Sequence, residues 1–520
     1  MKIQLINPPL LLNSLALTAH RPSPPLGLAY IAAALRTDGH RVSVIDAIGE
    51  APEQFAPCGQ FQQLGLTIEQ IIARIDKDTQ VIGITSIFSF IWAIVRLMIC
   101  RIRENFPEII IVCGGEHFTA LPEFSMQNAP IDYIVMGEGE QVVSELFAKL
   151  ESGAAFNPAG IPGICWRQES AIVCNNRAPR IKKIDKIKWP AWDLFDLEVY
   201  NKYNYVTGNK LGKTVPILAT RGCPYSCKFC SSKNMWTPRW YPRNPVDVVD
   251  EIEFYMRQYG AEHFPFQDLT PIIKREWVAA FCNEIISRGL KIRWQVAAGT
   301  RCEFVNEEIL LLMKKSGCDT LYYAPESGSE ETRISINKRM KTSNLMQAVD
   351  LTIKARLKLG VFLVLGFPDD TIRALRKTVK LVRKLALKGL IDISPAFYFP
   401  IPASALFNEL SKKKRIQIDD SFLLTPIFMH NLWMTDENNY CQNISSRTLT
   451  FYKYWIVANF YIISWMTHPW RIVTLLYNVA VDKESSKMDT FLNMMKRKML
   501  KKVINLKKMG KDLKKNKAMF

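Results

Sequence analysis

Short apolar runs alternate with amphipathic stretches through the first 150 residues of the chain. The runs are rich in β-branched residues, and segments with helical periodicity, such as 27–37 and 68–75, separate them. The runs span residues 3–6, 42–45, 81–85, 109–113 and 133–135. Continuously apolar strands are typical of a parallel sheet that helices cover on both faces. The pattern therefore predicts a doubly wound α/β sheet, with ligands at the carboxyl ends of its strands.

A second β/α series begins near residue 215. Its strand candidates span residues 215–220, 263–266, 292–296, 320–324, 361–365 and 393–397. Amphipathic stretches between them predict helices at 246–259, 274–288, 306–316, 342–359 and 371–387. Six β/α units in succession predict a second α/β domain.

Two regions lack this alternation. Residues 151–208 are irregular and contain a Pro/aromatic run at 189–193, so we interpret them as a linker. Residues 431–520 show no β/α signal; 451–466 predicts a buried or interfacial helix and 491–517 a basic helix. The predicted divisions are 1–150, 151–208, 209–430 and 431–520.

Composition places the chain among globular proteins. It has 520 residues, enough for two or three domains, and 48% of them are hydrophobic. No stretch reaches the roughly 18–20 apolar residues of a membrane-spanning helix. The N-terminal sequence lacks the pattern of a signal peptide. Nine of the twelve cysteines are scattered singly, which is unlike a disulfide framework and favours a reducing cytoplasm.

The net charge of +19 is concentrated at one end. Residues 481–520 carry 13 Lys and Arg against 4 Asp and Glu, which is +9, and the other 480 residues carry +10. The excess therefore describes a basic tail, and we expect no nucleic-acid groove.

Three cysteines close to one another carry the strongest chemical signal. Cys223, Cys227 and Cys230 directly follow the first strand of the second series. Three thiolates can hold three irons of a [4Fe–4S] cluster and leave the fourth iron open to a ligand. A structural zinc site would need a fourth ligand, and His263 and Cys282 are the nearest downstream candidates, each in a different predicted element. Accidental core cysteines are the other alternative.

The spacing C-x3-C-x2-C, with Phe229 before the last cysteine, resembles the signature of the radical S-adenosylmethionine (radical SAM) superfamily. The resemblance implies a partial (β/α)6 TIM-type barrel with its active site at the C-terminal strand ends. It also implies a cluster on the three cysteines and S-adenosylmethionine (SAM) on its open iron. An external electron donor of the flavodoxin or ferredoxin type is expected.

The same resemblance suggests which residues bind SAM. They lie at the ends of the barrel strands and are Phe229, Gln267, Asp268, Glu326, Ser327, Arg339 and Gly366. Lys338 beside Arg339 is a further candidate for the carboxylate. The chain departs from its relatives at Leu269, where they often have a polar residue, and at Ala403-Ser404, where many have Gly-Thr.

The doubly wound domain ahead of the barrel resembles the Rossmann-like cobalamin-binding domain of class B radical SAM methyltransferases. The implied cobalamin contacts are Pro8, Asp46, Thr85, Ser86, Gly114, Gly115, His117, Gly137, Glu138 and Gly139. Ile48 stands where the motif of cobalamin domains has its axial His, so the resemblance implies a His-off cobalamin. A nucleotide fold that has lost cobalamin is the alternative.

The resemblance implies methylation of an unactivated carbon or phosphorus centre, through a 5′-deoxyadenosyl radical and methylcobalamin. A radical cyclisation, ring rearrangement or oxidation in natural-product, lipid or tetrapyrrole metabolism is the alternative, and a non-catalytic cobalamin or metal sensor a more distant one. We expect a small-molecule or lipid substrate. The aromatic helix and basic tail suggest peripheral contact of a cytoplasmic enzyme with the inner face of a membrane.

Overall fold

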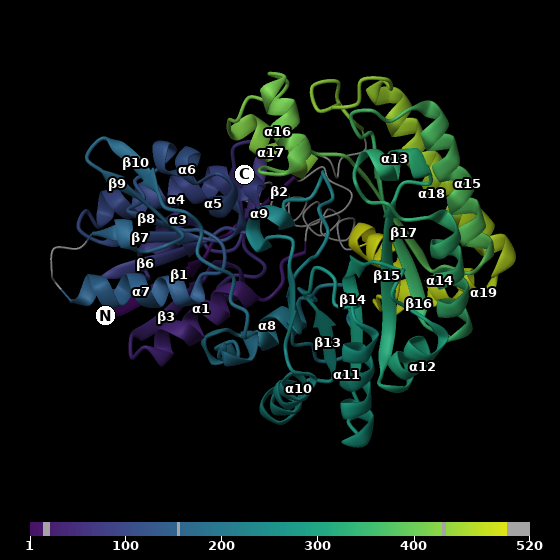
Figure 1. Cartoon of the computed structure of the whole chain (residues 1–520), viewed down its shortest axis with the longest axis horizontal. Coiled ribbons are helices and arrows are strands. Elements are labelled where there is room, and N and C mark those ends of the chain that lie inside the picture. The colour runs from purple at the N-terminus through teal and green to yellow at the C-terminus, as the bar shows by residue number, and fades with distance from the viewer. Residues whose placement is uncertain (14–20, 153–156, 429–432, 497–520) are drawn as a thin grey trace, which may run out of the picture.

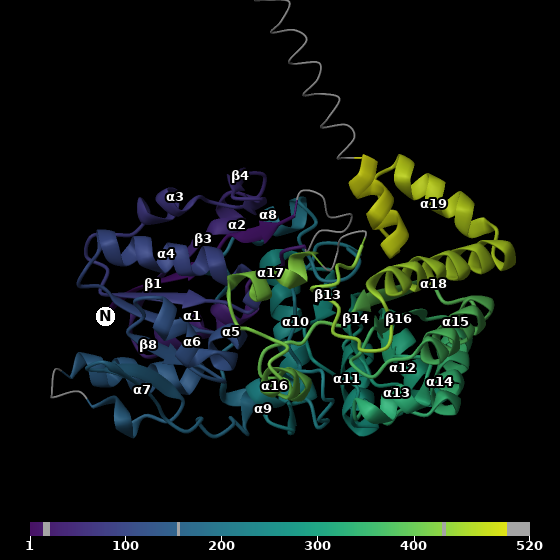
Figure 2. The same ribbon diagram turned by 90° about the horizontal axis from the view of Figure 1, so that it is seen from above.

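The computed structural model describes residues 1–13, 21–152, 157–428 and 433–496. Two α/β units lie side by side, and α18 (Ser446–Thr467) and α19 (Trp470–Ala480) lie on the outer side of the second unit (Figures 1 and 2). The N-terminal sheet contains β1 (Lys2–Asn7), β3 (Arg41–Asp46), β6 (Val81–Thr85), β7 (Ile110–Gly114), β8 (Tyr133–Val135), β9 (Ile164–Gln168) and β10 (Ala171–Cys174).

The order of this sheet is β10-β9-β8-β7-β6-β1-β3. The five strands from β3 to β8 are parallel, while β9 and β10 form an antiparallel extension. Because β1 lies between β3 and β6, the chain reverses its direction of winding beside β1. Such a switch point opens a crevice at the carboxyl ends of the strands.

Alternating side chains explain why both faces of the sheet are covered. Leu5 and Val112 belong to one apolar core, whereas Ile84 and Ile111 belong to a second core on the opposite face. The helices of this unit are α1 (Leu26–Thr37), α2 (Ala47–Glu50), α3 (Ile68–Ile72), η1 (Ser89–Ile91), α4 (Trp92–Asn105), α5 (Glu116–Ala120), α6 (Pro122–Asn128) and α7 (Glu140–Glu151). A small sheet of β2 (Leu10–Leu12), β5 (Phe61–Leu64) and β4 (Phe55–Cys58) lies beside them.

The second unit is a parallel sheet in the order β13-β14-β15-β16-β17. Its strands are β13 (His263–Phe266), β14 (Arg293–Thr300), β15 (Cys318–Glu326), β16 (Lys358–Leu365) and β17 (Asp392–Phe397). Thr214 and Ile217 bridge to β13 in parallel, so residues before β11 (Thr220–Gly222) supply the first of six strand positions. β11 itself pairs with β12 (Trp240–Pro242).

Helices follow the barrel strands in turn. They are α9 (Ser232–Trp236), α10 (Pro245–Tyr259), α11 (Arg275–Ser287), α12 (Glu307–Lys315), α13 (Glu330–Ser335), α14 (Thr342–Lys354), α15 (Ile372–Leu387), α16 (Ala405–Lys412) and α17 (Asp420–Phe428). Side-chain caps set several of their starts, as at Asn306 and Thr371, whose oxygens accept the N–H groups of Ile309 and Ala374.

The structure corrects three details of the pattern. The helix expected at 342–359 ends at Lys354, because Arg356 adopts a left-handed φ of 58° and β16 begins at Lys358. The first barrel strand, expected as one continuous strand at 215–220, consists of isolated bridges at Thr214 and Ile217 and the short strand β11. The irregular linker contains the β9–β10 hairpin, η2 (Pro158–Gly160), η3 (Ile184–Lys186), η4 (Trp192–Leu194) and α8 (Leu197–Lys202).

The β9–β10 hairpin also carries a disulfide. Cys165 and Cys174 face each other across the two strands, and their sulfur atoms are 2.04 Å apart. The spacing of the cysteines did not predict this pair.

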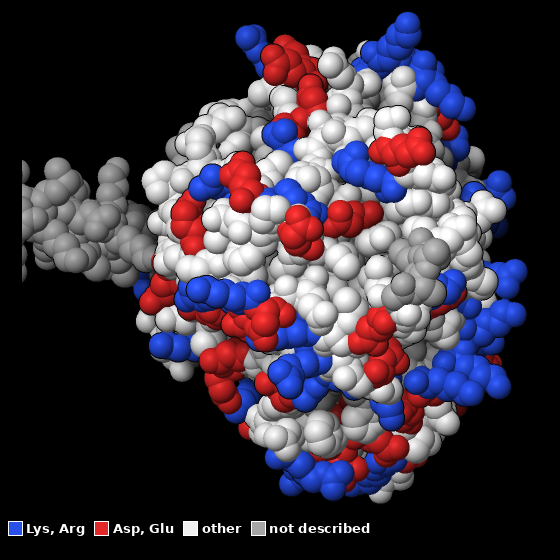
Figure 3. Space-filling model, turned by 90° about the vertical axis from the view of Figure 1, so that its left-hand side faces the viewer, with Lys and Arg blue, Asp and Glu red and all other residues white. Residues whose placement is uncertain are grey.

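Figure 3 shows the face of the molecule at the N-terminal sheet, where basic and acidic side chains are interspersed.

The C-terminal region is helical. α18 (Ser446–Thr467) packs along α15 and β17, and α19 (Trp470–Ala480) follows it (Figure 2). Residues 487–496 form a further helix. The predicted basic helix at 491–517 falls mostly outside the described residues. Within the described part of the chain, no helix is both long and apolar enough to cross a membrane.

Candidate functional site

A mostly apolar cleft of about 400 Å³ separates the carboxyl edge of the N-terminal sheet from the start of the barrel. Strand ends of β6, β7 and β8 form one wall, at the switch point of the sheet. The opposite wall includes Arg221 and Gly222 of β11, Trp236 of α9, and Gln267 and Leu269 after β13. The cleft therefore lies directly before the cysteine loop.

Glycines give the sheet side of the cleft its shape. A Cβ added at Gly27 would meet no atom within 4 Å, and one added at Gly114 or Gly137 would approach other atoms no closer than 3.7 and 3.9 Å. All three residues line the cleft, so their missing side chains leave open space there. Gly115 differs, because its φ of 105° and the Ser86 carbonyl, 2.7 Å from an added Cβ, exclude any other residue.

The cleft brings together six of the ten residues expected to contact cobalamin. They are Thr85, Gly114, Gly115, Gly137, Glu138 and Gly139. Pro8, Asp46, Ser86 and His117 are not among its lining residues.

Two of the four remaining residues have clear structural partners. Asp46 is buried, accepts hydrogen bonds from the Asn7 amide and the Tyr200 hydroxyl, and caps α2 through the N–H of Gly49. His117 is buried against Trp92, with ring centroids 4.9 Å apart, and its two ring nitrogens lie 3.0 and 3.3 Å from the hydroxyls of Ser89 and Ser125. Burial lowers the pKa of His117 to about 3, so this ring is neutral. Cobalamin contacts by Asp46 and His117 stay predictions.

A buried ion-pair cluster joins the two walls of the cleft. Arg221 of β11 donates to Glu138 (3.2 Å) and Glu140 (2.6 Å), and the second oxygen of Glu138 accepts from Arg180 at 2.5 Å. The Arg221 guanidinium also lies 5.0 Å from the Tyr30 ring centroid. Burial disfavours the charge on Arg221, but Glu140 and Glu138 outweigh burial and raise its pKa. Glu138 thus anchors the barrel strand that leads into the cysteines.

The cysteine loop is held from the far side of the barrel. The N–H of Lys228 donates to the carbonyl of Ile336 at 2.9 Å, and the Asn337 amide donates to the carbonyl of Ser226 at 2.9 Å. Ser231, just after the loop, donates to Glu116 of the N-terminal unit at 2.8 Å. These bonds fix the loop between the two units.

The three thiols are free and partly buried. Burial raises the pKa of Cys227 to about 11, and the nearby cations Lys338 and Arg301 oppose this rise. Cations beside the loop favour thiolates, the form that binds iron. In the parts of the chain that the structure describes, no three Cys, His, Asp or Glu side chains already form a metal-ligand group.

Lys338 connects the cysteine loop to Glu326. Its ammonium lies 2.7 Å from Glu326 Oε1 and 5.8 Å from the centroid of the Phe229 ring. Burial lowers the pKa of Lys338, but Glu326 and Cys227 outweigh burial, and the net shift is upward. Glu326 has a φ of 63°, a left-handed conformation that is costly for a residue with a side chain. Such backbone strain is typical of functional sites.

Of the other predicted SAM residues, Phe229 and Gly366 lie where two strand ends meet, whereas the side chains of Asp268 and Gln267 are hydrogen-bonded to other residues of the protein. Phe229 packs on Phe367, beside Gly366, with ring centroids 5.6 Å apart, so these two strand ends meet. Asp268 is buried and accepts from the Thr220 hydroxyl (2.6 Å) and the Ala219 N–H (3.1 Å), so in this structure it holds β11. The Gln267 amide donates to the Thr207 hydroxyl at 2.6 Å.

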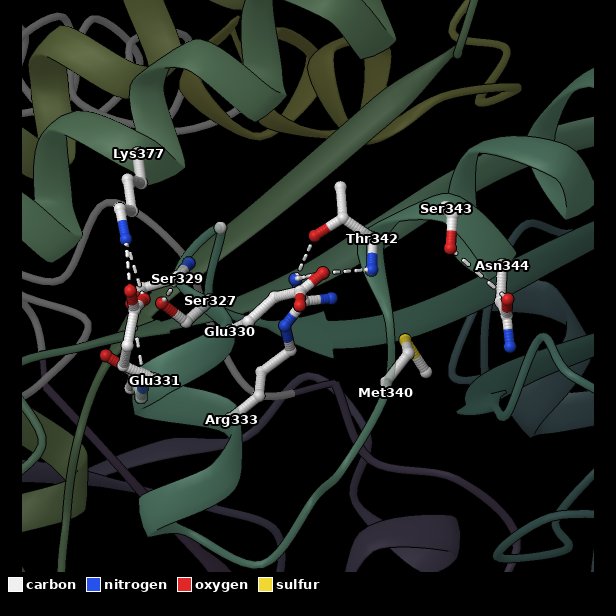
Figure 4. A network of polar contacts seen from close by, with 12 residues as sticks. Ser327, Ser329, Glu330, Glu331, Arg333, Met340, Thr342, Ser343, Asn344 and Lys377 are labelled. Carbon is white, nitrogen blue, oxygen red and sulfur yellow. Dashed lines mark hydrogen bonds and ion pairs between the residues drawn. The ribbon is translucent and has the colours of Figure 1, made fainter.

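Ser327 and Arg339 have different surroundings, and SAM binding by both stays a prediction. The Ser327 hydroxyl accepts from the N–H of Ser329 and is buried, whereas Arg339 is exposed and its neighbour Lys338 points inward. Figure 4 shows the polar network around α13, in which Lys377 pairs with Glu331 at 2.6 Å and the N–H of Thr342 donates to Glu330 at 2.6 Å. This network fixes the helix that precedes Lys338.

Sequence reasoning missed two cationic residues of this region. Arg301 follows β14, lies 4.1 Å from the Tyr225 ring centroid and donates to the Lys338 carbonyl at 2.7 Å. Arg221, two residues before Cys223, was not assigned a role. Its position beside the motif is a signal that could have been used, whereas Arg301 stands in no recognisable motif.

The residues present fit the implied cofactors. Three free thiols beside two cations suit an iron–sulfur cluster with one open iron. The glycine-lined, mostly apolar wall suits the flat face of a corrin, because an added Cβ at three positions would occupy the space. Both sets of residues lie where the N-terminal sheet meets the barrel.

Comparisons with known proteins agree with this geometry. The B12 binding domain model matches residues 13–147, and the Radical SAM superfamily model matches residues 217–382. The chain is 31% identical over 389 residues to uncharacterized methyltransferase PH0819 of Pyrococcus horikoshii, covering 74% of this chain and 78% of that protein. The chain therefore belongs to the family of radical SAM enzymes with a cobalamin (B12)-binding domain. Its cofactors are a [4Fe–4S] cluster, SAM and cobalamin.

Two other relatives are named for different reactions. Anaerobic magnesium-protoporphyrin IX monomethyl ester cyclase of Rubrivivax gelatinosus is 28% identical over 415 residues, which cover 78% of this chain and 69% of that protein. Cytidylyl-2-hydroxyethylphosphonate methyltransferase of Streptomyces wedmorensis is 28% identical over 465 residues, which cover 81% and 83%.

A solved structure shares the fold. The radical SAM methyltransferase TsrM of Kitasatospora setae, with cobalamin and a [4Fe–4S] cluster bound, superposes with a TM-score of 0.62. Its identity to this chain is 18%, and the match covers 89% of this chain and 88% of TsrM. The expected fold class, a cobalamin-binding α/β domain followed by a radical SAM barrel and a helical C-terminal region, is thereby confirmed.

Proposed function

We propose that this enzyme methylates an unactivated carbon or phosphorus centre of a small-molecule or lipid substrate. The observation that carries the proposal is the cleft, whose glycine wall faces the barrel strand leading into Cys223, Cys227 and Cys230. Two relatives named as methyltransferases, aligned over most of the chain, support the same reaction type. Radical SAM enzymes take electrons from an external reductant, and we propose a flavodoxin or ferredoxin for this role.

When bound, the cluster with SAM supplies a carbon radical that removes a substrate hydrogen, and cobalamin supplies the methyl group. The chain's own residues hold and orient these groups. The glycines at 114 and 137 let a corrin face approach the backbone. Lys338 and Glu326 are proposed to bind the carboxylate and amine of SAM, and Phe229 its adenine.

Product analysis after anaerobic reconstitution tests the reaction type. Methylation requires one SAM for the methyl group and a second for the radical, so S-adenosylhomocysteine and 5′-deoxyadenosine are expected in equal amounts. Formation of 5′-deoxyadenosine without S-adenosylhomocysteine would contradict methyl transfer.

Radical cyclisation or ring rearrangement is the second candidate, favoured by the relative named as a cyclase. Such a reaction needs no methyl donor. The ratio of S-adenosylhomocysteine to 5′-deoxyadenosine formed during turnover of a substrate therefore separates the two candidates.

We also propose that the enzyme works in the cytoplasm at the inner face of a membrane. The Lys-rich end supports this location, because clusters of Lys near a bilayer are attracted to anionic headgroups. The domain limits 1–150, 151–208, 209–430 and 431–520 stay proposals of the same kind.

A further inference from the structure

Two C-terminal helices expose many large apolar side chains. On α18 they are Phe451, Trp455, Ile462 and Met466, and on α19 they are Trp470, Ile472, Val473, Leu476 and Tyr477. We name these nine residues the apolar face. Met466 is 77% exposed, Val473 69% and Leu476 65%. Water-soluble proteins rarely expose so many neighbouring apolar groups unless the surface binds a partner.

The apolar face is ordered along the helices. Positions 451, 455, 462 and 466 fall on one stripe of α18, because their spacings of four, seven and four residues match whole helical turns. On α19 the one charged residue is Arg471, and its guanidinium turns inward to the carbonyls of Gly389 and Leu390, both at 2.6 Å. The outer surface of α19 is therefore uncharged.

The inner side of α18 is already committed to the barrel. Leu449 lies against Gly366, at 2.9 Å from the position of an added Cβ, and the Tyr461 hydroxyl donates to Asp392 at 3.4 Å. Asn459 accepts from Arg383 of α15 at 2.7 Å. Because these contacts fix the rotation of α18, its apolar stripe cannot turn inward.

Basic residues flank the apolar face. α15 packs along α18 (Figure 2). It contains no acidic residue and exposes Arg373, Arg376, Lys380 and Lys384. The sequence after Lys496 adds ten Lys and Arg against one Asp in residues 497–520. Lys496 itself donates to the Val479 carbonyl. The last residue that the structure describes, Lys496, therefore lies next to α19.

We propose that the apolar face docks on an anionic lipid bilayer, with the basic residues of α15 against the headgroups. This inference deepens the proposed location at a membrane. Aromatic side chains such as Trp455, Trp470 and Tyr477 favour the headgroup region, where their apolar and polar parts are both satisfied. An apolar stripe with a basic border is the pattern of helices that lie in the membrane interface.

Vesicle co-sedimentation of the full-length protein tests the proposal. The vesicles contain phosphatidylcholine alone or phosphatidylcholine mixed with phosphatidylglycerol. The face variant is Val473→Gln with Leu476→Gln. The matched control is Leu97→Gln with Leu311→Gln, which changes two exposed apolar positions of α4 and α12, at 50% and 52% exposure, away from the apolar face. A second variant replaces Lys501, Lys502, Lys507 and Lys508 with Gln.

The wild type and the control are expected to bind the phosphatidylglycerol vesicles equally. The face variant should bind at least about tenfold more weakly, since each lost side chain removes apolar burial in the bilayer. Equal binding by the face variant, with binding lost in the lysine variant, would overturn the docking surface but keep the membrane location.

Two other outcomes also overturn the proposal. No binding of the wild type to any vesicle would remove both the docking surface and the location. A concentration-dependent dimer in light scattering that the face variant abolishes, without vesicle binding, would make a second copy of the chain the occupant.

Discussion

The two walls of the cleft are built by different means. The sheet side presents backbone, because Gly27, Gly114 and Gly137 leave space where side chains would stand. The barrel side and the cysteine loop use buried or stacked cations, namely Arg221, Arg301 and Lys338. The sheet side therefore supplies open space for a flat ligand, and the barrel side supplies positive charge. Changes to the sheet side should alter cobalamin fit at little cost in stability, whereas changes to the barrel side should alter stability or radical chemistry.

The largest effect is expected at the cysteine loop. Cys227→Ser should abolish cluster absorbance and 5′-deoxyadenosine formation, because two thiolates cannot hold the cluster with one open iron. Iron content and product formation after anaerobic reconstitution measure this. Cys100→Ser, a partly buried cysteine of α4, is the matched control. An intact cluster in the Cys227 variant would mean that these cysteines are not its ligands.

The ion-pair cluster should govern stability. Arg221→Met leaves Glu140 buried without its cation and Glu138 with Arg180 alone, and breaking a buried ion pair in this way typically costs about 3–5 kcal/mol. Lys388→Met breaks the exposed pair with Asp350 and should cost less than about 1 kcal/mol. Urea unfolding followed by tryptophan fluorescence compares the two variants. Equal losses would refute a special role for the buried cluster.

Lys338 should affect SAM more than cobalamin. Lys338→Met is expected to lower 5′-deoxyadenosine formation by about 10²-fold, because it removes a buried positive charge beside Glu326 and Cys227. Its cobalamin content should equal that of the wild type. Arg339→Met decides between the two neighbours, since Arg339 is exposed. A larger loss for Arg339→Met would support the assignment of Arg339 made from the sequence.

A smaller effect is expected on the sheet side. Gly114→Ala should lower cobalamin affinity by roughly tenfold, because the new methyl group occupies space in the cleft. The melting temperature of the apoprotein should not change, since the nearest atom is 3.7 Å from the added Cβ. Gly160→Ala, outside the cleft, is the control. Unchanged cobalamin binding in a titration would show that the corrin does not use this wall.

The smallest effect concerns pH. Burial raises the pKa of Asp268 from 3.8 to about 6. The folded state then holds a proton that the unfolded state has released between these values, so stability falls as pH rises from about 4 to 6. Between pH 5 and 7 the loss should be roughly 1 kcal/mol in the wild type and absent in Asp268→Asn. Paired urea titrations at the two pH values measure it, and an identical pH response would contradict the shift.

Periodicity predicted the fold well because continuous apolar strands and amphipathic helices are local features. The β6 and β13 strands have the expected bounds, and the helix ending at Lys354 was extended too far because a left-handed turn at Arg356 leaves no composition signal. The hairpin of β9 and β10 is short and half exposed, so its pattern was weak.

Site residues could be predicted where the motif residue itself shapes the site. The glycines at the ends of β7 and β8 were predicted and line the cleft, because a glycine in the sequence directly indicates backbone without a side chain. The contact partners of the charged side chains could not be predicted. Whether Glu138 faces a ligand or Arg221, and whether Lys338 or Arg339 points inward, depends on contacts between segments far apart in the chain.

Anaerobic reconstitution of the purified wild type with iron, sulfide and hydroxocobalamin, followed by reduction with SAM, tests the central claim most directly. We expect one [4Fe–4S] cluster and one cobalamin per chain, with 5′-deoxyadenosine formed only when the cluster is present. A chain that forms the cluster and cleaves SAM but retains no cobalamin after gel filtration would contradict the account of the cleft.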